Sequence, residues 1–135
     1  MEPVPKGTAE YNLILKEYEE VKYNITREKD FNRFLGGLPI TLEKKDIFNI
    51  MSKDTKNNYN YSITQKADGT RYLMFISYKP NKSINERCIV FIDRNNDFFI
   101  LKNDKGETLQ NIKSPRMLID GELIAYNNQN KQISI

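Results

Sequence analysis

The sequence predicts an α+β fold in which an antiparallel sheet follows a helical N-terminal segment. Apolar residues recur at helical spacing before residue 53, and after residue 59 short apolar runs alternate with turn-forming residues. Strands joined by tight turns pair antiparallel, and helices gathered at one end of the chain define the α+β class. We expect residues 1–34 to form the helical segment and residues 35–135 to carry the sheet.

The first predicted helix begins just after an extended leader. Residues 1–7 contain two prolines and a glycine and should have little structure of their own. Thr8 is placed to cap a helix that runs to about Lys22. Its apolar stripe is Tyr11, Ile14, Leu15, Tyr18 and Val21, with Glu17, Glu19 and Glu20 facing outward. We expect this stripe to pack on the same domain, and docking onto another domain or subunit is the alternative.

Two shorter helices are expected next. One covers residues 24–34, is opened by Thr26 and ends before the glycine pair at 36 and 37. The other is capped by Thr41 and runs from Leu42 to about Ser52. The buried side of this last helix should consist of Leu42, Ile47, Phe48, Ile50 and Met51.

The rest of the chain is predicted to be nearly all strand, because apolar runs alternate with turn signals. The expected strands are residues 59–63, 71–78, 87–93, 98–102, 117–126 and 131–135, the last cut short by the end of the sequence. Tyr72, Phe75 and Ile92 should contribute mainly to stability.

The composition restricts both location and chemistry. Of 135 residues, 39% are hydrophobic and 29% charged, with no run long enough to cross a membrane and no signal-peptide core. We therefore expect a single intracellular domain, with nucleus, cytoplasm and virion left open. The chain has no histidine and one cysteine, Cys88, so lysine and carboxylates are left to carry any catalysis. A net charge of +3 favours a phosphate-bearing partner only weakly.

One stretch, just after the strand at 59–63, carries residues suited to catalysis. Lys66 is followed by Asp68, Gly69 and Arg71. A lysine is a nucleophile once its ammonium loses a proton, which burial or neighbouring cations promote. Asp68 would orient the turn, Gly69 would let the backbone pass close to a ligand, and Arg71 offers a fork for phosphate or ribose oxygens. Taken alone, the stretch is better explained as a hairpin, because an Asp-Gly pair between apolar runs is a strong turn signal.

Three ordered blocks resemble the motifs of the covalent nucleotidyltransferases, the superfamily of DNA ligases, RNA ligases and mRNA capping guanylyltransferases. Lys66-Ala67-Asp68-Gly69-Thr70-Arg71 resembles motif I, Lys-x-Asp-Gly-x-Arg. Residues 90–100 resemble motif III, and residues 117–124 resemble motif IIIa. Three features are most similar to those of capping guanylyltransferases. They are the sequence of motif I, the Ile-Asp-Arg of motif III and the upstream element at residues 37–47. The resemblance covers roughly residues 35–126.

This resemblance implies the N-terminal part of a nucleotidyltransferase domain. Lys66 would attack the α-phosphate of GTP, hold GMP covalently and pass it to the 5′ diphosphate end of RNA. A divalent metal, Mg or Mn, would assist the reaction, and Glu122 is one candidate ligand for it. The implied nucleotide-binding residues are Thr64, Gln65, Ala67, Asp68, Gly69, Arg71, Arg94, Asp120 and Glu122. In isolation, Arg94 would be only a turn cation and Glu122 only a surface carboxylate.

The family pattern also includes motifs IV and V and a motif VI on an OB domain, none of which is found in these 135 residues. We therefore expect a fragment, or a chain completed by another polypeptide, that is inactive alone. RNA triphosphatase and methyltransferase domains or subunits are further expected partners. Two alternatives stay open: an ATP-dependent DNA or RNA ligase adenylation domain, and a non-catalytic module that binds RNA or a partner protein.

Overall fold

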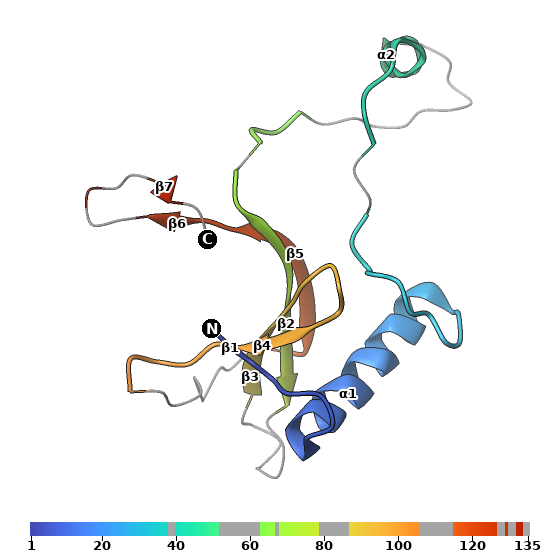
Figure 1. The fold of residues 1–135 in the computed structure, drawn as a ribbon. Helices are drawn as coiled ribbons and strands as arrows, with labels where there is room; N and C mark the ends of the chain where they lie inside the picture. Colours follow the sequence, from blue (N-terminus) through green and yellow to red (C-terminus); the bar gives the residue numbers. More distant parts are fainter. Residues whose placement is uncertain are drawn as a thin grey trace. The chain divides into compact units, whose positions relative to one another are not determined.

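The computed structural model describes residues 1–37, 40–51, 63–66, 68–78, 87–105, 115–126, 129 and 132–133. The chain forms two compact units, a larger one of Met1–Gly36 with Asp68–Ile135 and a smaller one of Gly37–Ala67. In the larger unit a helix packs on a five-stranded antiparallel sheet (Figure 1), which confirms the predicted α+β class. Among the described residues, no helix is both long and apolar enough to span a membrane.

The helix of the larger unit is α1 (Ala9–Thr26). Thr8 caps its start, because the Thr8 hydroxyl oxygen accepts a hydrogen bond from the Tyr11 N–H at 3.2 Å. At its end, Arg27 adopts a left-handed backbone conformation with φ of 59° and donates its N–H to the Tyr23 carbonyl at 2.8 Å. The predicted cap is confirmed, and the helix ends at Thr26 rather than near Lys22.

The helix expected at residues 24–34 is not formed, and this prediction is wrong. Thr26 belongs to the last turn of α1, where its hydroxyl donates to the Lys22 carbonyl oxygen at 2.8 Å. The left-handed conformation of Arg27 then turns the backbone away from the helical path. Residues 27–36 therefore form an irregular segment of the larger unit.

The sheet has the strand order β1-β4-β3-β2-β5. Its strands, in that order, are Glu2–Pro3, Phe98–Ile100, Arg87–Ile92, Thr70–Tyr78 and Met117–Leu123. A separate pair consists of β6 (Ala125–Tyr126) and β7 (Gln132–Ile133). The predicted strand at 117–126 is thus divided between two sheets at Ile124. Of the strand predicted at 59–63, only Ile63 lies among the described residues, and it is not in a strand.

The N-terminal leader contributes a strand that the sequence did not predict. Glu2 and Pro3 form β1, which pairs with β4. Val4 follows with 7% exposure and donates its N–H to the Phe98 carbonyl at 2.8 Å. A proline is tolerated here because β1 is the outermost strand of the sheet. The leader therefore covers the edge of β4.

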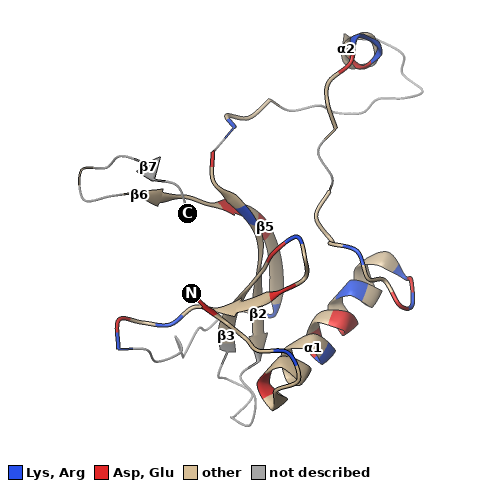
Figure 2. Ribbon diagram, viewed as in Figure 1, with Lys and Arg blue, Asp and Glu red and all other residues tan. Residues whose placement is uncertain are grey.

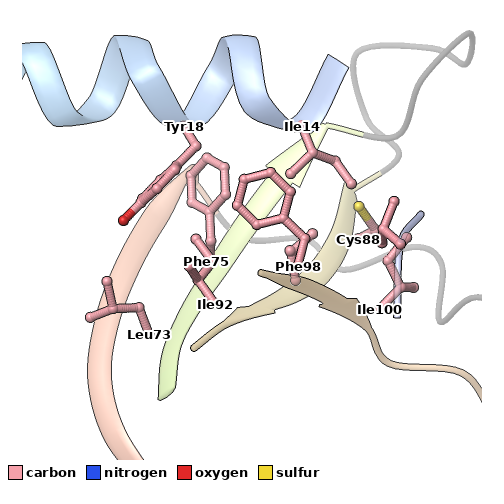
Figure 3. Close-up of a cluster of buried hydrophobic side chains, with 10 residues drawn as sticks. Ile14, Tyr18, Leu73, Phe75, Cys88, Ile92, Phe98 and Ile100 are labelled. Carbon is pink, nitrogen blue, oxygen red and sulfur yellow. The ribbon is translucent and has the colours of Figure 1, made fainter. Parts of the chain in front are cut away.

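The core lies between α1 and one face of the sheet (Figure 3). Side chains alternate along a strand, so every second residue of β2 and β3 faces the helix. The most buried side chains are Ile14, Tyr18, Leu73, Phe75, Cys88, Val90, Ile92 and Phe98. The stripe of α1 thus packs on its own domain as expected, and Phe75 and Ile92, both 0% exposed, are core residues as predicted. Tyr72 points to the opposite face and is only half-buried.

Two polar side chains of α1 are also withdrawn from solvent. Glu17 was expected to face outward, but it is half-buried and accepts a hydrogen bond from the hydroxyl of Ser77, which is 0% exposed. Lys22 is 8% exposed, and its Nζ lies 5.0 Å from the centroid of the Tyr18 ring. Glu19 and Glu20 are exposed, as expected.

The smaller unit contains the helix α2 (Lys44–Met51). It begins later than predicted, because the Asp46 carboxylate, rather than Thr41, accepts the Glu43 N–H at 2.8 Å. The expected buried side is exposed: Leu42, Ile47, Phe48, Ile50 and Met51 range from 43% to 75% exposure. Hence the described residues of this unit provide no core for the helix.

Candidate functional site

Three of the predicted site residues gather where β2 and β5 pair. The register sets Arg71 opposite Glu122, and Asp120 lies two residues before Glu122 on the same strand. Because side chains alternate, all three project from the face of the sheet that packs on α1 farther along β2. Basic and acidic segments of the two strands lie side by side at this point (Figure 2).

Arg71 and Asp120 form a two-pronged ion pair. The Arg71 Nε donates to Asp120 Oδ1 at 2.9 Å, and Nη2 donates to Oδ2 at 2.5 Å. The Arg71 side chain is 20% exposed and that of Asp120 is 44% exposed. The bond from Arg71 lowers the pKa of the Asp120 carboxyl, and the same bond raises the pKa of Arg71. Both groups therefore stay charged at neutral pH, and Asp120 fixes one edge of the guanidinium.

Glu122 and Gly69 join motif IIIa to motif I. The Gly69 N–H donates to Glu122 Oε1 at 2.9 Å. A Cβ atom at Gly69 would lie 2.4 Å from the carbonyl oxygen of Leu123, a backbone atom that cannot yield as a side chain does. We expected Gly69 to allow close approach of a ligand, and the structure adds a second reason for glycine, the close approach of β5.

Arg94 is exposed and makes no hydrogen bond or ion pair with these three described residues. It lies in the turn between β3 and β4, and its guanidinium makes no ion pair with any residue that the structure describes. The turn itself is fixed, because Asp93 Oδ1 accepts the N–H groups of Asn95 at 2.8 Å and Asp97 at 2.9 Å. Asn96 completes the turn with a left-handed φ of 60°.

The predicted nucleophile, Lys66, belongs to the smaller unit, which is described by itself. Thr64, Gln65 and Lys66 are exposed and lie outside helices and strands. Ala67 is outside the described residues, and Asp68, exposed, opens the second part of the larger unit. In the sequence, Lys66 lies shortly before Gly69, whose backbone N–H donates to the Glu122 carboxylate.

The opposite face of the sheet carries an apolar pocket that the sequence analysis missed. A cavity of about 180 Å³ is lined by Tyr72, Met74, Phe91, Ile119, Gly121, Glu122 and Leu123. The ring of Tyr72 meets those of Phe91 and Phe99 nearly edge to face, at 6.0 Å in each case. Tyr72 therefore lines a pocket as well as contributing to stability. The signal was available, because the second set of alternate residues in β2 and β3 is also apolar.

The described residues do not form a metal site by themselves. Among them, no three His, Cys, Asp or Glu side chains lie close enough together to hold a metal ion. Asp120 is bound to Arg71, and Glu122 accepts the Gly69 N–H. These residues therefore do not fit a metal without further ligands, and no step through a metal is derived from them.

Comparison with known proteins gives two similar curated relatives. The mRNA-capping enzyme subunit alpha of Yarrowia lipolytica is 26% identical over 113 residues, which cover 78% of this chain and 26% of that protein. The protein of the same name from Saccharomyces cerevisiae is 28% identical over 108 residues, which cover 74% of this chain and 22% of that protein. The chain thus spans about a quarter of the length of these relatives. No solved structure matches it.

A family model agrees with these relatives. The model described as "mRNA capping enzyme, catalytic domain" matches residues 8–134. The match includes α1, the smaller unit, most of the larger unit and all three motif blocks. Since it extends over nearly the whole sequence, the chain belongs to the family of mRNA capping enzyme catalytic domains.

Proposed function

We propose that the protein to which these residues belong is an mRNA guanylyltransferase. The observation that carries the proposal is the hydrogen bond between Gly69 and Glu122, which joins motif I to motif IIIa in a chain of the capping family. This bond fixes the backbone at Gly69, which is close to Lys66 in the sequence and lies beside the Arg71–Asp120 pair. Such an arrangement supports a site in which a lysine acts next to ordered polar groups.

The proposed reaction has two steps at one phosphorus atom. First, the neutral Nζ of Lys66 attacks the α-phosphorus of GTP. A P–N bond forms, the bond to the bridging oxygen breaks, pyrophosphate leaves with the electron pair, and the amine proton passes to solvent. Then a terminal oxygen of the RNA 5′ diphosphate attacks the same phosphorus, the P–N bond breaks, and Nζ regains a proton. Positioning supplies much of the catalysis in such transfers.

We assign the remaining roles from residue chemistry. The fork of Arg71, oriented by Asp120, suits ribose or phosphate oxygens, and the Glu122 carboxylate suits ribose hydroxyls. Arg94, exposed on its turn, is available to the phosphate side of the nucleotide. Backbone and hydroxyl groups beside the lysine, at Thr64, Gln65 and Ala67, would read the edge of the base. A divalent metal, Mg or Mn, would supply positive charge at the phosphates, and it would need ligands other than the described residues.

Competition labelling tests the proposal. The complete protein is incubated with GTP labelled at the α-phosphate, with and without excess unlabelled ATP, and the denatured protein is assayed for label. We expect adduct formation from GTP that ATP leaves unchanged, because a site that hydrogen-bonds one base edge rejects the other. An adduct formed from ATP instead would identify a ligase. Absence of an adduct from either nucleotide would support a non-catalytic binding module.

A further inference from the structure

We propose that residues 32–36, the segment that follows α1, form a clamp that positions Arg71 for the nucleotide. This inference rests on the proposed function, because the role of Arg71 at the nucleotide is part of that proposal. The clamp residues precede all three motif blocks in the sequence, so the motifs assign them no role. The contacts of Phe34 and Gly36 carry the inference.

The Arg71 guanidinium lies over the ring of Phe34. The Cζ atom of Arg71 is 5.4 Å from the centroid of the Phe34 ring, while Asp120 binds the guanidinium edge through Nε and Nη2. An aromatic ring and a carboxylate that both contact the guanidinium restrict its movement more than either contact does alone. Together they hold the arginine in one orientation before any ligand binds, which reduces the entropy lost on binding.

Gly36 leaves the space that this arrangement needs. A Cβ atom at Gly36 would lie 2.5 Å from Cε1 of Phe34 and 2.6 Å from Nη2 of Arg71. Gly36 is not required for a left-handed backbone, because among the described glycines only Gly7 has a positive φ. Glycine is therefore needed at position 36 for space. The atoms that would clash are ends of side chains, so an added methyl group displaces them and leaves the backbone in place.

The clamp is tied to two other parts of the larger unit. The Nζ of Lys22, on α1, donates to the Phe31 carbonyl oxygen at 2.9 Å, just before the clamp begins. The Asn96 side chain, in the turn of motif III, donates from Nδ2 to the Asn32 carbonyl oxygen at 3.1 Å. One short segment therefore connects α1, the motif III turn and the arginine of motif I.

Substitutions at Phe34 test the clamp through the kinetics of adduct formation. In the complete protein, Phe34→Leu removes the ring and should raise the KM for GTP by about two- to fivefold, the range expected for one exposed cation–π contact, with kcat little changed. Phe34→Tyr keeps the ring and should stay near the wild-type KM. Phe31→Leu is the matched control, because the Phe31 ring lies 5.0 Å from Cζ of Arg33, outside the site, and KM should not change.

The neighbouring glycines give a second matched pair. Gly36→Ala should raise the KM for GTP in the same way as Phe34→Leu. Gly37→Ala should leave it unchanged, because a Cβ atom at Gly37 would meet nothing within 4 Å. Equal effects of the two alanines, or none from either, would overturn the clamp.

A double-mutant cycle separates positioning from a general effect on folding. If Phe34 acts through Arg71, Phe34→Leu should have no further effect on KM in an Arg71→Ala background. The same cycle on thermal unfolding needs no activity: the two substitutions should be non-additive, whereas Phe31→Leu and Arg71→Ala should add. Additive effects of Phe34→Leu and Arg71→Ala on the unfolding midpoint would refute the clamp, even in a protein that forms no adduct. A wild-type protein without an adduct from GTP would refute the proposed function instead.

Discussion

At the scale of single residues, the site is organised by charge and by close contact. Arg71 and Asp120 hold each other in the charged form, and Glu122 is tied to the backbone of Gly69. The first link connects β2 to β5, and the second connects the residue just before β2 to β5, a strand distant in sequence. Substitution of either acid should therefore affect the pairing of these strands as well as any bound nucleotide.

The Asp120 carboxyl gives a prediction about pH. Its folded-state pKa is lowered by the bond from Arg71, so its contribution to stability is complete above the unfolded pKa of about 3.9 and is lost as the pH falls through the folded pKa. Asp120→Asn should lower stability at pH 7 by less than about 1 kcal/mol, because exposed pairs are screened by solvent. Thermal unfolding of both proteins from pH 7 to pH 2 checks this. A difference that persists unchanged at the acid end would contradict it.

Gly69 gives a prediction about backbone packing. Gly69→Ala would bring Cβ to 2.4 Å from the Leu123 carbonyl oxygen, so β2 and β5 must separate locally. We expect a loss of about 1–3 kcal/mol in the free energy of unfolding, the usual cost of overpacking. Gly121→Ala is the control, since its Cβ would meet nothing within 4 Å. Denaturant unfolding that shows equal stability for both variants would count against the close approach.

The three charged residues of the proposed pocket give a prediction about activity. Alanine at Arg71, Arg94 or Glu122 should weaken adduct formation from GTP about tenfold or more, as loss of a charge-assisted bond does, while the fold stays largely intact. Labelling at several GTP concentrations, together with circular dichroism, measures both effects. Wild-type labelling in all three variants would remove these residues from the site.

Part of this site could be predicted from the sequence, and the reason is spacing. Lys66, Arg71, Arg94 and Glu122 stand at fixed places within blocks that resemble known motifs. Phe34 offers no such signal, because its contact with Arg71 joins distant parts of the chain and depends on the irregular path after α1. Contacts of this kind follow from tertiary packing, which local patterns do not encode.

At the scale of elements, the same contrast appears in the helices and strands. The stripe of α1 and the alternation of β2 and β3 predicted the core, because periodicity reports burial directly. The helix predicted at 24–34 is not formed, since Thr26 bonds back to Lys22 and does not open a new helix. The short strand β1 was also missed, because its partners lie in β4, near residue 100.

Tyr18 of α1 gives a prediction about the core. Its hydroxyl is buried and, among the described residues, has no hydrogen-bond partner, and burial raises its pKa to about 12. Tyr18→Phe removes this unsatisfied group and should be neutral or stabilise the fold by about 1 kcal/mol. Phe75→Ala, in contact with the same ring at 5.9 Å, should cost about 3–5 kcal/mol. Denaturant unfolding measures both, and a marked loss of stability in Tyr18→Phe would mean that the hydroxyl has a partner.

At the scale of the whole molecule, the match to the catalytic domain family covers all three blocks that resemble nucleotidyltransferase motifs. The peptide from Lys66 to Gly69 joins the two compact units, so the proposed nucleophile, Lys66, and the fixed residue Gly69 belong to different units. The proposed chemistry therefore depends on how the complete protein holds this peptide. The relatives that the chain matches are about four times as long as the part it covers.

The central claim is that Lys66 carries the nucleotide, and peptide mapping tests it most directly. The complete protein is incubated with GTP and a divalent metal, digested at neutral to alkaline pH to preserve the P–N bond, and analysed by mass spectrometry, with Lys66→Arg as the control. We expect the mass of GMP on the peptide that contains Lys66 and no adduct in Lys66→Arg, because a guanidinium stays protonated and does not attack phosphorus. GMP on a different lysine, or an adduct that persists in Lys66→Arg, would contradict the assignment.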